Sequence, residues 1–267
     1  MATTVIYHGD CNDGFAAAWV AWMKLWDGTA YVPAKYGDDP PPVGPGDEVY
    51  ILDFSYPREV LLDLRSKAGS LLVLDHHKTA EADLKDLPFC VFDMEQSGAA
   101  LAWQHFFPQG ARPWIVDYVQ DRDLWTWSLE HSRQVNAAIS SWSRSFDAWD
   151  RIWVSPAGFE HAISDGIAIL RYIDQYTEEM CAHARWVDFV GERVPIVNAP
   201  YKGISEICGK LAEQAPFSLG WFQRGDGKYQ YSLRSRGDYD VSALARSHGG
   251  GGHKNSAGFV SDEQLDL

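Results

Sequence analysis

Acidic residues and histidines gather directly after the apolar runs of this chain, where their side chains could bind a ligand. The first group is His8, Asp10 and Asp13, the second is Asp53, the third is Asp75-His76-His77, and the fourth is Asp121 with Asp123. A single aspartate in such a position often caps a helix or forms a turn. That interpretation stays open for Asp10 and Asp123 taken singly, whereas two histidines directly after a buried run are harder to explain in this way.

Divalent cations would explain why several carboxylates meet. Carboxylates cannot share one cleft as bare anions, since like charges a few ångströms apart force some of them to take up protons. Mixed carboxylate and imidazole donors suit manganese, magnesium or iron. Two such ions with one bridging carboxylate would lower the pKa of a bound water and hold a phosphoryl group for in-line attack. The residues therefore indicate hydrolysis of a phosphoester or a phosphoanhydride.

The cysteines do not indicate a site of their own. They are scattered without CxxC spacing, at Cys11, Cys90, Cys181 and Cys208. This spacing favours neither a structural zinc site nor a disulfide framework. We expect free thiols in a reducing compartment.

A second candidate site lies in the sequence GGGGHKNSAGF at residues 249–259. Consecutive glycines suit places where the backbone approaches a ligand or adopts positive φ, and successive N–H groups there can bind an anion. Nearby cationic side chains would add donors for a phosphate or carboxylate. We predict a substrate-binding loop, with a flexible linker as the alternative. Its expected residues are Gly250, Gly251, Gly252, His253 and Lys254, with Arg234 from a neighbouring strand.

Strands and helices alternate through the first half of the chain, and they must position the first four groups. Continuous Val, Ile and Leu runs predict strands at residues 3–7, 30–34, 48–54, 70–77 and 89–93, with helices at 15–26, 57–68 and 97–106. Buried strands separated by helices indicate a doubly wound, mainly parallel α/β sheet covered on both faces. In such sheets ligands bind outside the carboxyl ends of the strands, which is where the acidic groups lie.

The second half of the chain predicts a connector and a smaller domain. Residues 125–187 are mostly helical in pattern, and a new alternation of strands and helices begins near residue 194. We therefore expect a metal-binding catalytic domain at residues 1–130, a helical connector at 131–190 and a smaller C-terminal α/β domain at 191–267. We expect the cleft between the two domains to hold the substrate.

Composition narrows the set of partners. The 267 residues are 46% hydrophobic, which suffices for a folded core, and the net charge is −14. Affinity for long duplex nucleic acid is built from many phosphate contacts, so this charge argues against such a partner. There is no run of about 18 apolar residues and no basic segment of a signal peptide at the first residues. We predict a cytoplasmic protein without a membrane partner, and we leave a homodimer open.

With these residues assembled, the chain resembles the DHH/DHHA1 phosphoesterases. Asp75-His76-His77 corresponds to the Asp-His-His triplet for which the family is named. The other shared motifs are, in order, the loop from His8 to Gly14, ILDF with Asp53, SGAA at 97–100, QDRDLW at 120–125, SLRS, and GGGGHKNSAGF. The resemblance covers nearly the full length and implies a DHH domain followed by a DHHA1 domain.

The resemblance also implies roles for individual residues. The implied metal ligands are His8, Asp10, Asp13, Asp53, His76 and Asp121, with Asp53 bridging two ions. It implies that His77 faces the substrate, that Asp75 orients the histidines, and that Asp123 supports the site beside the substrate. The family pattern has an aspartate two residues before Asp13, where this chain has Cys11; Asp10 is the nearest carboxylate and would need a one-residue insertion to serve.

The predicted function is a phosphodiesterase that uses two divalent ions, manganese first and magnesium as an alternative. Its expected substrates are short single-stranded oligonucleotides or linear or cyclic dinucleotides, cleaved by metal-activated water. An exopolyphosphatase is the alternative enzyme. A catalytically silent nucleotide-binding module is the alternative from another class.

Overall fold

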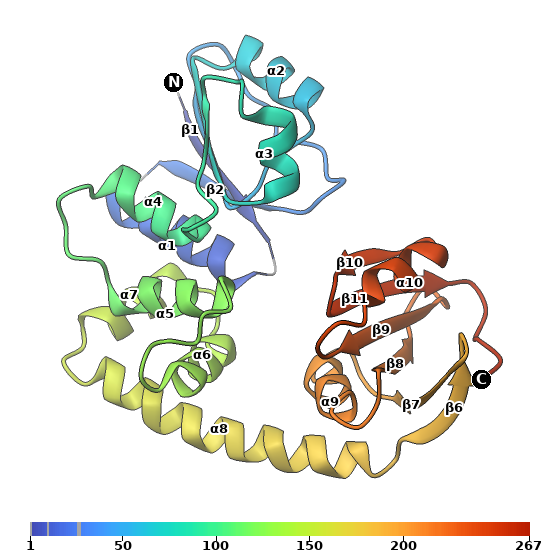
Figure 1. Cartoon of the computed structure of the whole chain (residues 1–267). Helices are drawn as coiled ribbons and strands as arrows, with labels where there is room; N and C mark the ends of the chain where they lie inside the picture. The colour runs from blue at the N-terminus through green and yellow to red at the C-terminus, as the bar shows by residue number, and fades with distance from the viewer. Residues whose placement is uncertain (1, 10, 26–27) are drawn as a thin grey trace. The chain divides into compact units, whose positions relative to one another are not determined.

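The computed structural model describes residues 2–9, 11–25 and 28–267 (Figure 1). The chain divides into two compact units, Met1–Ile169 and Leu170–Leu267. Each unit has its own sheet and its own hydrophobic core. We describe each unit by itself.

The first unit is built on a five-stranded sheet with the order β2-β1-β3-β4-β5. All four strand pairs are parallel, which confirms the α/β fold predicted from the sequence. The register pairs Tyr7 with Leu52 and Leu52 with Leu74, so β1, β3 and β4 end side by side. The strands are β1 (Thr3–His8), β2 (Thr29–Ala34), β3 (Glu48–Leu52), β4 (Ser70–Asp75) and β5 (Cys90–Phe92).

Helices cover both faces of this sheet. The helices α1 (Asn12–Leu25) and α4 (Gly98–Phe106) pack on one face, in a core that includes Trp19 and Leu101. The helices α2 (Arg58–Lys67) and α3 (Lys78–Leu84) pack on the other face. The alanine-rich sequence of α1 lets this helix lie close to α4, because small side chains keep the two backbones near each other.

Three further helices extend the first core, two of them beyond residue 130. They are α5 (Trp114–Asp123), α6 (Ser132–Ser141) and α7 (Phe146–Val154). Val135, Ile139 and Trp149 are fully or almost fully buried in the same core as α1. The long helix α8 (Gly158–Cys181) follows, with Ala162 in this core and Tyr176 against the core of the second unit. The segment predicted as a connector thus packs largely with the first unit.

The second unit contains a six-stranded sheet with the order β10-β11-β9-β8-β7-β6. Only β7 and β8 pair in parallel. The helix α9 (Ile204–Leu211) packs against Val197, and α10 (Val241–Ser247) packs against the opposite face with Ile196. The strands are β6 (Arg185–Phe189), β7 (Glu192–Asn198), β8 (Phe217–Gln223), β9 (Tyr229–Ser235), β10 (Gly251–His253) and β11 (Ser256–Ser261).

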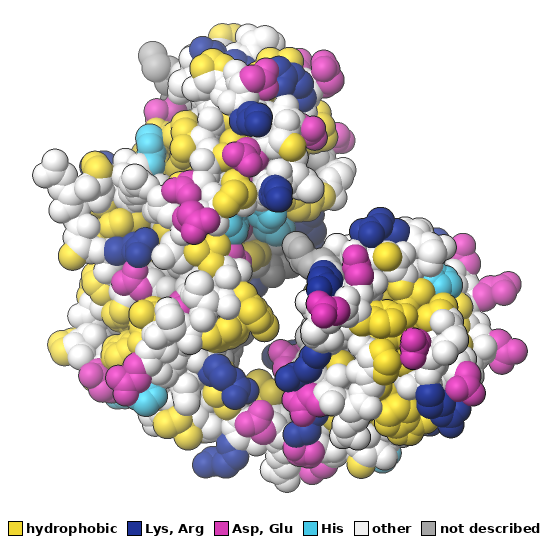
Figure 2. Space-filling view, viewed as in Figure 1, with side chains coloured by type: hydrophobic (Ala, Val, Ile, Leu, Met, Phe, Trp, Pro, Cys, Tyr) yellow, Lys and Arg dark blue, Asp and Glu magenta, His cyan; other side chains and the backbone are white. Residues whose placement is uncertain are grey.

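Charged side chains of both signs are interspersed on the face of the two units that Figure 2 shows. None of the helices in the described part of the chain is long and apolar enough to cross a membrane.

Candidate metal centre

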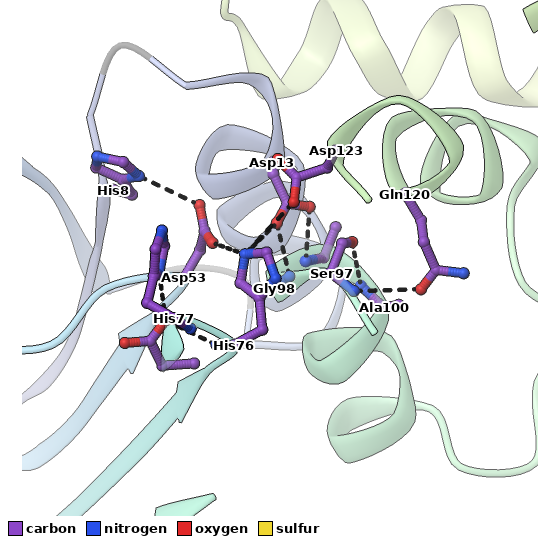
Figure 3. Close-up of polar contacts among 12 residues, drawn as sticks. His8, Asp13, Asp53, His76, His77, Ser97, Gly98, Ala100, Gln120 and Asp123 are labelled. Carbon is purple, nitrogen blue, oxygen red and sulfur yellow. Dashed lines mark hydrogen bonds and ion pairs between the residues drawn. The ribbon is translucent and has the colours of Figure 1, made fainter. Parts of the chain in front are cut away.

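Asp53 is the central residue of the candidate site. It directly follows β3, is 1% exposed, and has a φ of 57°, which residues with a side chain rarely adopt. Its carboxylate oxygens face different histidines: Oδ1 lies 3.0 Å from His76 Nε2 and Oδ2 lies 3.4 Å from His8 Nδ1 (Figure 3). Burial would raise the pKa of Asp53, but its interactions with His76 and His8 lower it to about 2. Asp53 is therefore an anion placed between two imidazoles.

Gly98, the first residue of α4, leaves the space that Asp53 occupies. A Cβ atom at position 98 would overlap the Cβ of Asp53 and lie 2.8 Å from its Oδ1. Ser97 caps the helix by accepting a hydrogen bond from the Ala100 N–H, and Gln120 Oε1 accepts one from the Ser97 N–H. The SGAA motif thus fixes the N-terminus of α4 beside Asp53.

The same helix end orients Asp13. The Gly98 and Ala99 N–H groups donate hydrogen bonds of 2.6 and 3.0 Å to its two oxygens, where the helix dipole favours negative charge. Asp13 Oδ2 also lies 3.7 Å from His76 Nε2. Burial raises the pKa of Asp13, and the charges of Asp53 and Asp123 raise it further. A cation at this place would relieve that repulsion.

Asp75 orients the two histidines of the triplet. It ends β4 and is fully buried. Its Oδ1 accepts hydrogen bonds of 2.7 Å from the His76 N–H and 2.6 Å from His77 Nδ1, and its Oδ2 accepts one of 2.5 Å from Ser55 Oγ. The hydrogen bond to Asp75 raises the pKa of His77. This arrangement leaves the Nε2 atom of His77 to contact a ligand.

His76 Nε2 points at three carboxylates. Besides Asp53 and Asp13, it lies 3.4 Å from Asp123 Oδ2. Burial alone would lower the pKa of His76, but the hydrogen bond with Asp53 and the charges of Asp13, Asp53 and Asp123 raise it to about 9. In the metal-free site a proton on His76 therefore balances the carboxylates, and a cation bound at Nε2 would take the place of that proton.

The structure brings Asp123, rather than Asp121, to this cluster. The Asp121 carboxylate turns to the loop that follows α5, where it accepts hydrogen bonds from Thr126 Oγ1, Ser128 Oγ and the Ser128 N–H at 2.7 to 2.8 Å. Burial would raise the pKa of Asp121, but hydrogen bonds with Ser132, Thr126 and Ser128 lower it to about 2. Burial and the Asp53 charge raise the pKa of Asp123. Asp121 thus holds the loop, and Asp123 faces the candidate ligands.

Cys11 is a donor that we did not include among the expected ligands. Its Sγ forms one potential metal-binding group with His8 and Asp53, in which the donor atoms lie within 4.8 Å of one another. Burial raises the pKa of the Cys11 thiol to about 12, with further contributions from the Asp53 and Asp13 charges. Its position two residues before Asp13 was the signal that could have identified it. The expected ligand Asp10 lies outside the described residues.

Two potential metal-binding groups share Asp53, namely His8, Cys11 and Asp53, and Asp53, His76 and His77. A third group, Asp13, His76 and Asp123, shares His76 with the second. Within each group the donor atoms lie within 4.8 Å of one another, and together the groups fit two divalent cations. Asp53 Oδ2 and His8 Nδ1 are buried polar atoms that face each other at 3.4 Å and make no hydrogen bond with any described residue. Buried polar atoms are rarely left in that state unless they serve a ligand.

In the second unit, a cavity of about 450 Å³ lies between α9 and the β9-β11-β10 edge of the sheet. Arg234, Gly251 and Gly252 line it, together with Ser205 and Gln230. The Arg234 guanidinium donates hydrogen bonds to Ser205 Oγ at 2.6 Å and to the Leu233 carbonyl oxygen at 2.8 Å, which fixes its position. Burial lowers the pKa of Arg234. Three of the predicted substrate-binding residues thus meet in one cavity.

The other glycine-rich residues have different surroundings. Residues Gly251–His253 form β10 and pair with β11, so this part of the sequence is an edge strand and not an irregular loop. Gly250 packs where a Cβ atom would overlap the backbone of Gly258. The Lys254 ammonium lies 3.1 Å from Asp238 Oδ1 and does not line the cavity. The side chain of His253 lies outside the described part of the structure.

Residues 194–267 match the DHHA1 domain family. The whole chain also has the fold of a solved DHH domain that belongs to a member of a family of ribosomal proteins, with a TM-score of 0.63 and 12% identity over 97% of this chain and 82% of that one. The chain thus carries a DHHA1 domain and has a fold shared with a DHH domain. This confirms the resemblance drawn from the sequence, with the DHHA1 domain in the second unit.

One further relative and two further solved structures match most of the length of this chain. An uncharacterized protein of Acanthamoeba polyphaga mimivirus is 30% identical over 96% of this chain, which spans 66% of that relative. The pGpG-specific phosphodiesterase PggH of Vibrio cholerae has a TM-score of 0.56 and 14% identity, over 97% of this chain and 93% of that one. RecJ of Thermus thermophilus, solved with Mn²⁺, has a TM-score of 0.56 and 13% identity, over 98% of this chain and 49% of that one.

Proposed function

We propose that this protein is a divalent-metal-dependent phosphodiesterase that hydrolyses short single-stranded oligonucleotides or linear or cyclic dinucleotides. The observation that carries the proposal is the position of Asp53, whose two oxygens face two separate donor sets. Bridging carboxylates of this kind occur where two cations act on one phosphoryl group. The fold shared with a pGpG phosphodiesterase and with RecJ supports a phosphodiester substrate.

The proposed ligands are His8 and Asp53 on one side and Asp13, Asp53, His76 and Asp123 on the other. Bound cations, Mn²⁺ or Mg²⁺ on the carboxylate-rich side, would polarise a phosphoryl oxygen and make a bound water more acidic. Asp75 holds His77 through Nδ1, and the raised pKa of His77 favours the protonated ring. Its Nε2 would then donate a hydrogen bond to the charge that develops on the phosphoryl group.

Trp125 and Trp127 favour a substrate that carries a base. Trp125 lies two residues after Asp123 and is 74% exposed, and its ring lies 5.1 Å from that of Trp127 at an angle of 78°. Both residues have positive φ, and the Asp121 carbonyl oxygen accepts a hydrogen bond from the Trp127 N–H. Stacking of a base on such a ring contributes about 1–3 kcal/mol. Polyphosphate offers no base to stack.

The DHHA1 domain contains a second candidate binding site. Arg234 is fixed by Ser205 and lines a cavity that Gly251 and Gly252 keep free of side chains. A guanidinium in this position suits a phosphate or a carboxylate. We propose that this cavity takes a terminal phosphate of the nucleotide.

The proposal is tested by incubating the purified full chain with Mn²⁺ and four substrates: a linear dinucleotide, a cyclic dinucleotide, a short RNA and polyphosphate. We expect mononucleotide release from at least one phosphodiester, and its loss in His76→Ala. Tight nucleotide binding without hydrolysis in Mn²⁺ or Mg²⁺ would show a binding module instead.

A variant of Trp125 separates the two enzyme classes. Trp125→Ala should raise the KM for the nucleotide about tenfold or more, since base stacking contributes about 1–3 kcal/mol. Trp186→Ala, which removes another exposed tryptophan in β6, is the matched control and should leave KM unchanged. Faster turnover of polyphosphate than of any nucleotide, with no effect of Trp125→Ala, would point to an exopolyphosphatase.

A further inference from the structure

We propose that Cys11 is a metal ligand, and that the set His8, Cys11 and Asp53 selects a thiophilic divalent ion such as Zn²⁺, Fe²⁺ or Co²⁺ over Mg²⁺ and Mn²⁺. The inference rests on the proposed metal centre and specifies the chemistry of one half of it. The two halves would then differ in the ions that they prefer.

The geometry of this half brings three kinds of donor to one point. The Cys11 Sγ, a His8 ring nitrogen and an Asp53 carboxylate oxygen lie within 4.8 Å of one another. The backbone fixes Cys11 at this place, because its carbonyl oxygen accepts a hydrogen bond of 3.2 Å from the Phe15 N–H in the first turn of α1. Gly14 allows that turn to pack on the end of β1, since a Cβ atom there would overlap the His8 carbonyl oxygen.

A second, independent observation points to a ligand in this group. The side chain of Asp53 is only 1% exposed, yet its Oδ2 makes no hydrogen bond with any described residue. This atom faces the buried Nδ1 of His8 across 3.4 Å, and that nitrogen makes no hydrogen bond with the described residues either. A buried carboxylate oxygen without a hydrogen bond costs free energy, which a bound cation would recover. The thiol of Cys11 is the third donor, beside Asp53 Oδ2 and the His8 ring.

The other half of the centre offers a different set of donors. Asp13 and Asp123 supply carboxylate oxygens and His76 supplies an imidazole nitrogen, without sulfur. Oxygen-rich sets suit Mg²⁺ and Mn²⁺, whereas a thiolate with an imidazole favours zinc and related ions. Cys90, Cys181 and Cys208 belong to none of the potential metal-binding groups among the described residues. Cys11 is thus distinguished from them by its neighbours.

The test is a Co²⁺ titration of the metal-free full chain, followed by near-ultraviolet and visible absorption. We expect a thiolate-to-cobalt charge-transfer band that is absent from Cys11→Ser and present in Cys90→Ser, the matched control on β5. Cys11→Asp should also lose the band and should raise the affinity for Mn²⁺ relative to Co²⁺ about tenfold or more. A cobalt complex without the band, or a band unchanged in Cys11→Ser, would overturn the proposal.

A measurement on the unmodified protein tests the proposal even if the Cys11 variants fail to fold. Alkylation of Cys11, followed by peptide mass spectrometry, should be slowed by Zn²⁺ or Co²⁺ and much less by Mg²⁺; equal rates in all ions would contradict the proposal. Hydrolysis is assayed separately. A charge-transfer band without hydrolysis of any substrate would support Cys11 as a metal ligand and refute the proposed function. Hydrolysis without the band would support the proposed function and refute Cys11 as a ligand.

Discussion

Two aspartates at the end of α5 show how surroundings decide the role of a side chain. Asp121 and Asp123 are two residues apart, and on an α-helix such residues point about 200° from each other. Asp121 accepts hydrogen bonds from Thr126 and Ser128, whereas Asp123 lies 3.4 Å from His76. The sequence motif contains both residues, but it does not give the rotation of the helix. Only the structure distinguishes the two positions.

The opposite pKa shifts of these residues predict opposite effects on stability. The lowered pKa of Asp121 means that its carboxylate stabilises the fold at neutral pH, and this contribution is lost as the pH falls from about 4 to about 2. The raised pKa of Asp123 means that its charge destabilises the metal-free fold at neutral pH. Asp121→Asn should therefore lower the free energy of unfolding by about 1–3 kcal/mol.

Asp123→Asn is the matched variant, since it makes the same chemical change two residues away. In EDTA at pH 7 it should unfold at the same temperature as the unchanged protein or higher, and it should lose Mn²⁺ affinity and hydrolysis. Circular dichroism during heating and a metal titration measure the two effects. An unstable Asp123→Asn variant with normal metal binding would contradict the assignment of Asp123 as a metal ligand.

At the scale of the elements, the N-terminus of α4 assembles the centre. Its N–H groups bind Asp13, and Gly98 leaves room for Asp53 beside it. The order of the strands β1, β3 and β4 then brings His8, Asp53 and the triplet to the same edge of the sheet. One helix end and three strand ends thus position donors that are far apart in the sequence.

Gly98→Ala should disrupt this arrangement without removing any ligand. The added Cβ would overlap Asp53, and displacement of a catalytic group by about 1 Å can cost about 100-fold in rate. We expect a loss of kcat of that order together with weaker metal binding. Gly44→Ala is the control, because its Cβ would meet only Asp47 at an ordinary distance. Normal kinetics in Gly98→Ala would show that Asp53 has room to move.

The strands of the first unit could be predicted from the sequence because each is a continuous apolar run bounded by turn residues. The parallel sheet and the residues at its carboxyl edge follow from that pattern. The strand β10 could not be predicted from the sequence, because Gly251 and Gly252 have no side chains and so show no alternation of apolar and polar residues. Cys11 was not among the expected ligands although it stands two residues before Asp13, because the residue type differs from the expected aspartate and its neighbours His8 and Asp53 meet it only in the fold.

At the scale of the whole molecule, the proposed function requires a chain with a net charge of −14 to bind an anionic substrate. Its negative charge would repel a phosphodiester, so positive charge has to be supplied locally. The first unit gathers Asp13, Asp53 and Asp123 around one histidine, and the second places Arg234 in a cavity. Removal of divalent ions should therefore abolish substrate binding as well as hydrolysis. Dinucleotide binding that persists in EDTA with an unchanged Kd would contradict this expectation.

The central claim is that two cations share Asp53, and a Mn²⁺ titration of the metal-free protein tests it most directly. At Mn²⁺ concentrations high enough to fill the half with Cys11 as well, metal analysis and low-temperature electron paramagnetic resonance should detect two Mn²⁺ ions per chain with the spectrum of a spin-coupled pair, and Asp53→Asn should lose that coupling. One ion per chain at saturation, or two uncoupled ions with the same spectrum in Asp53→Asn, would contradict the claim.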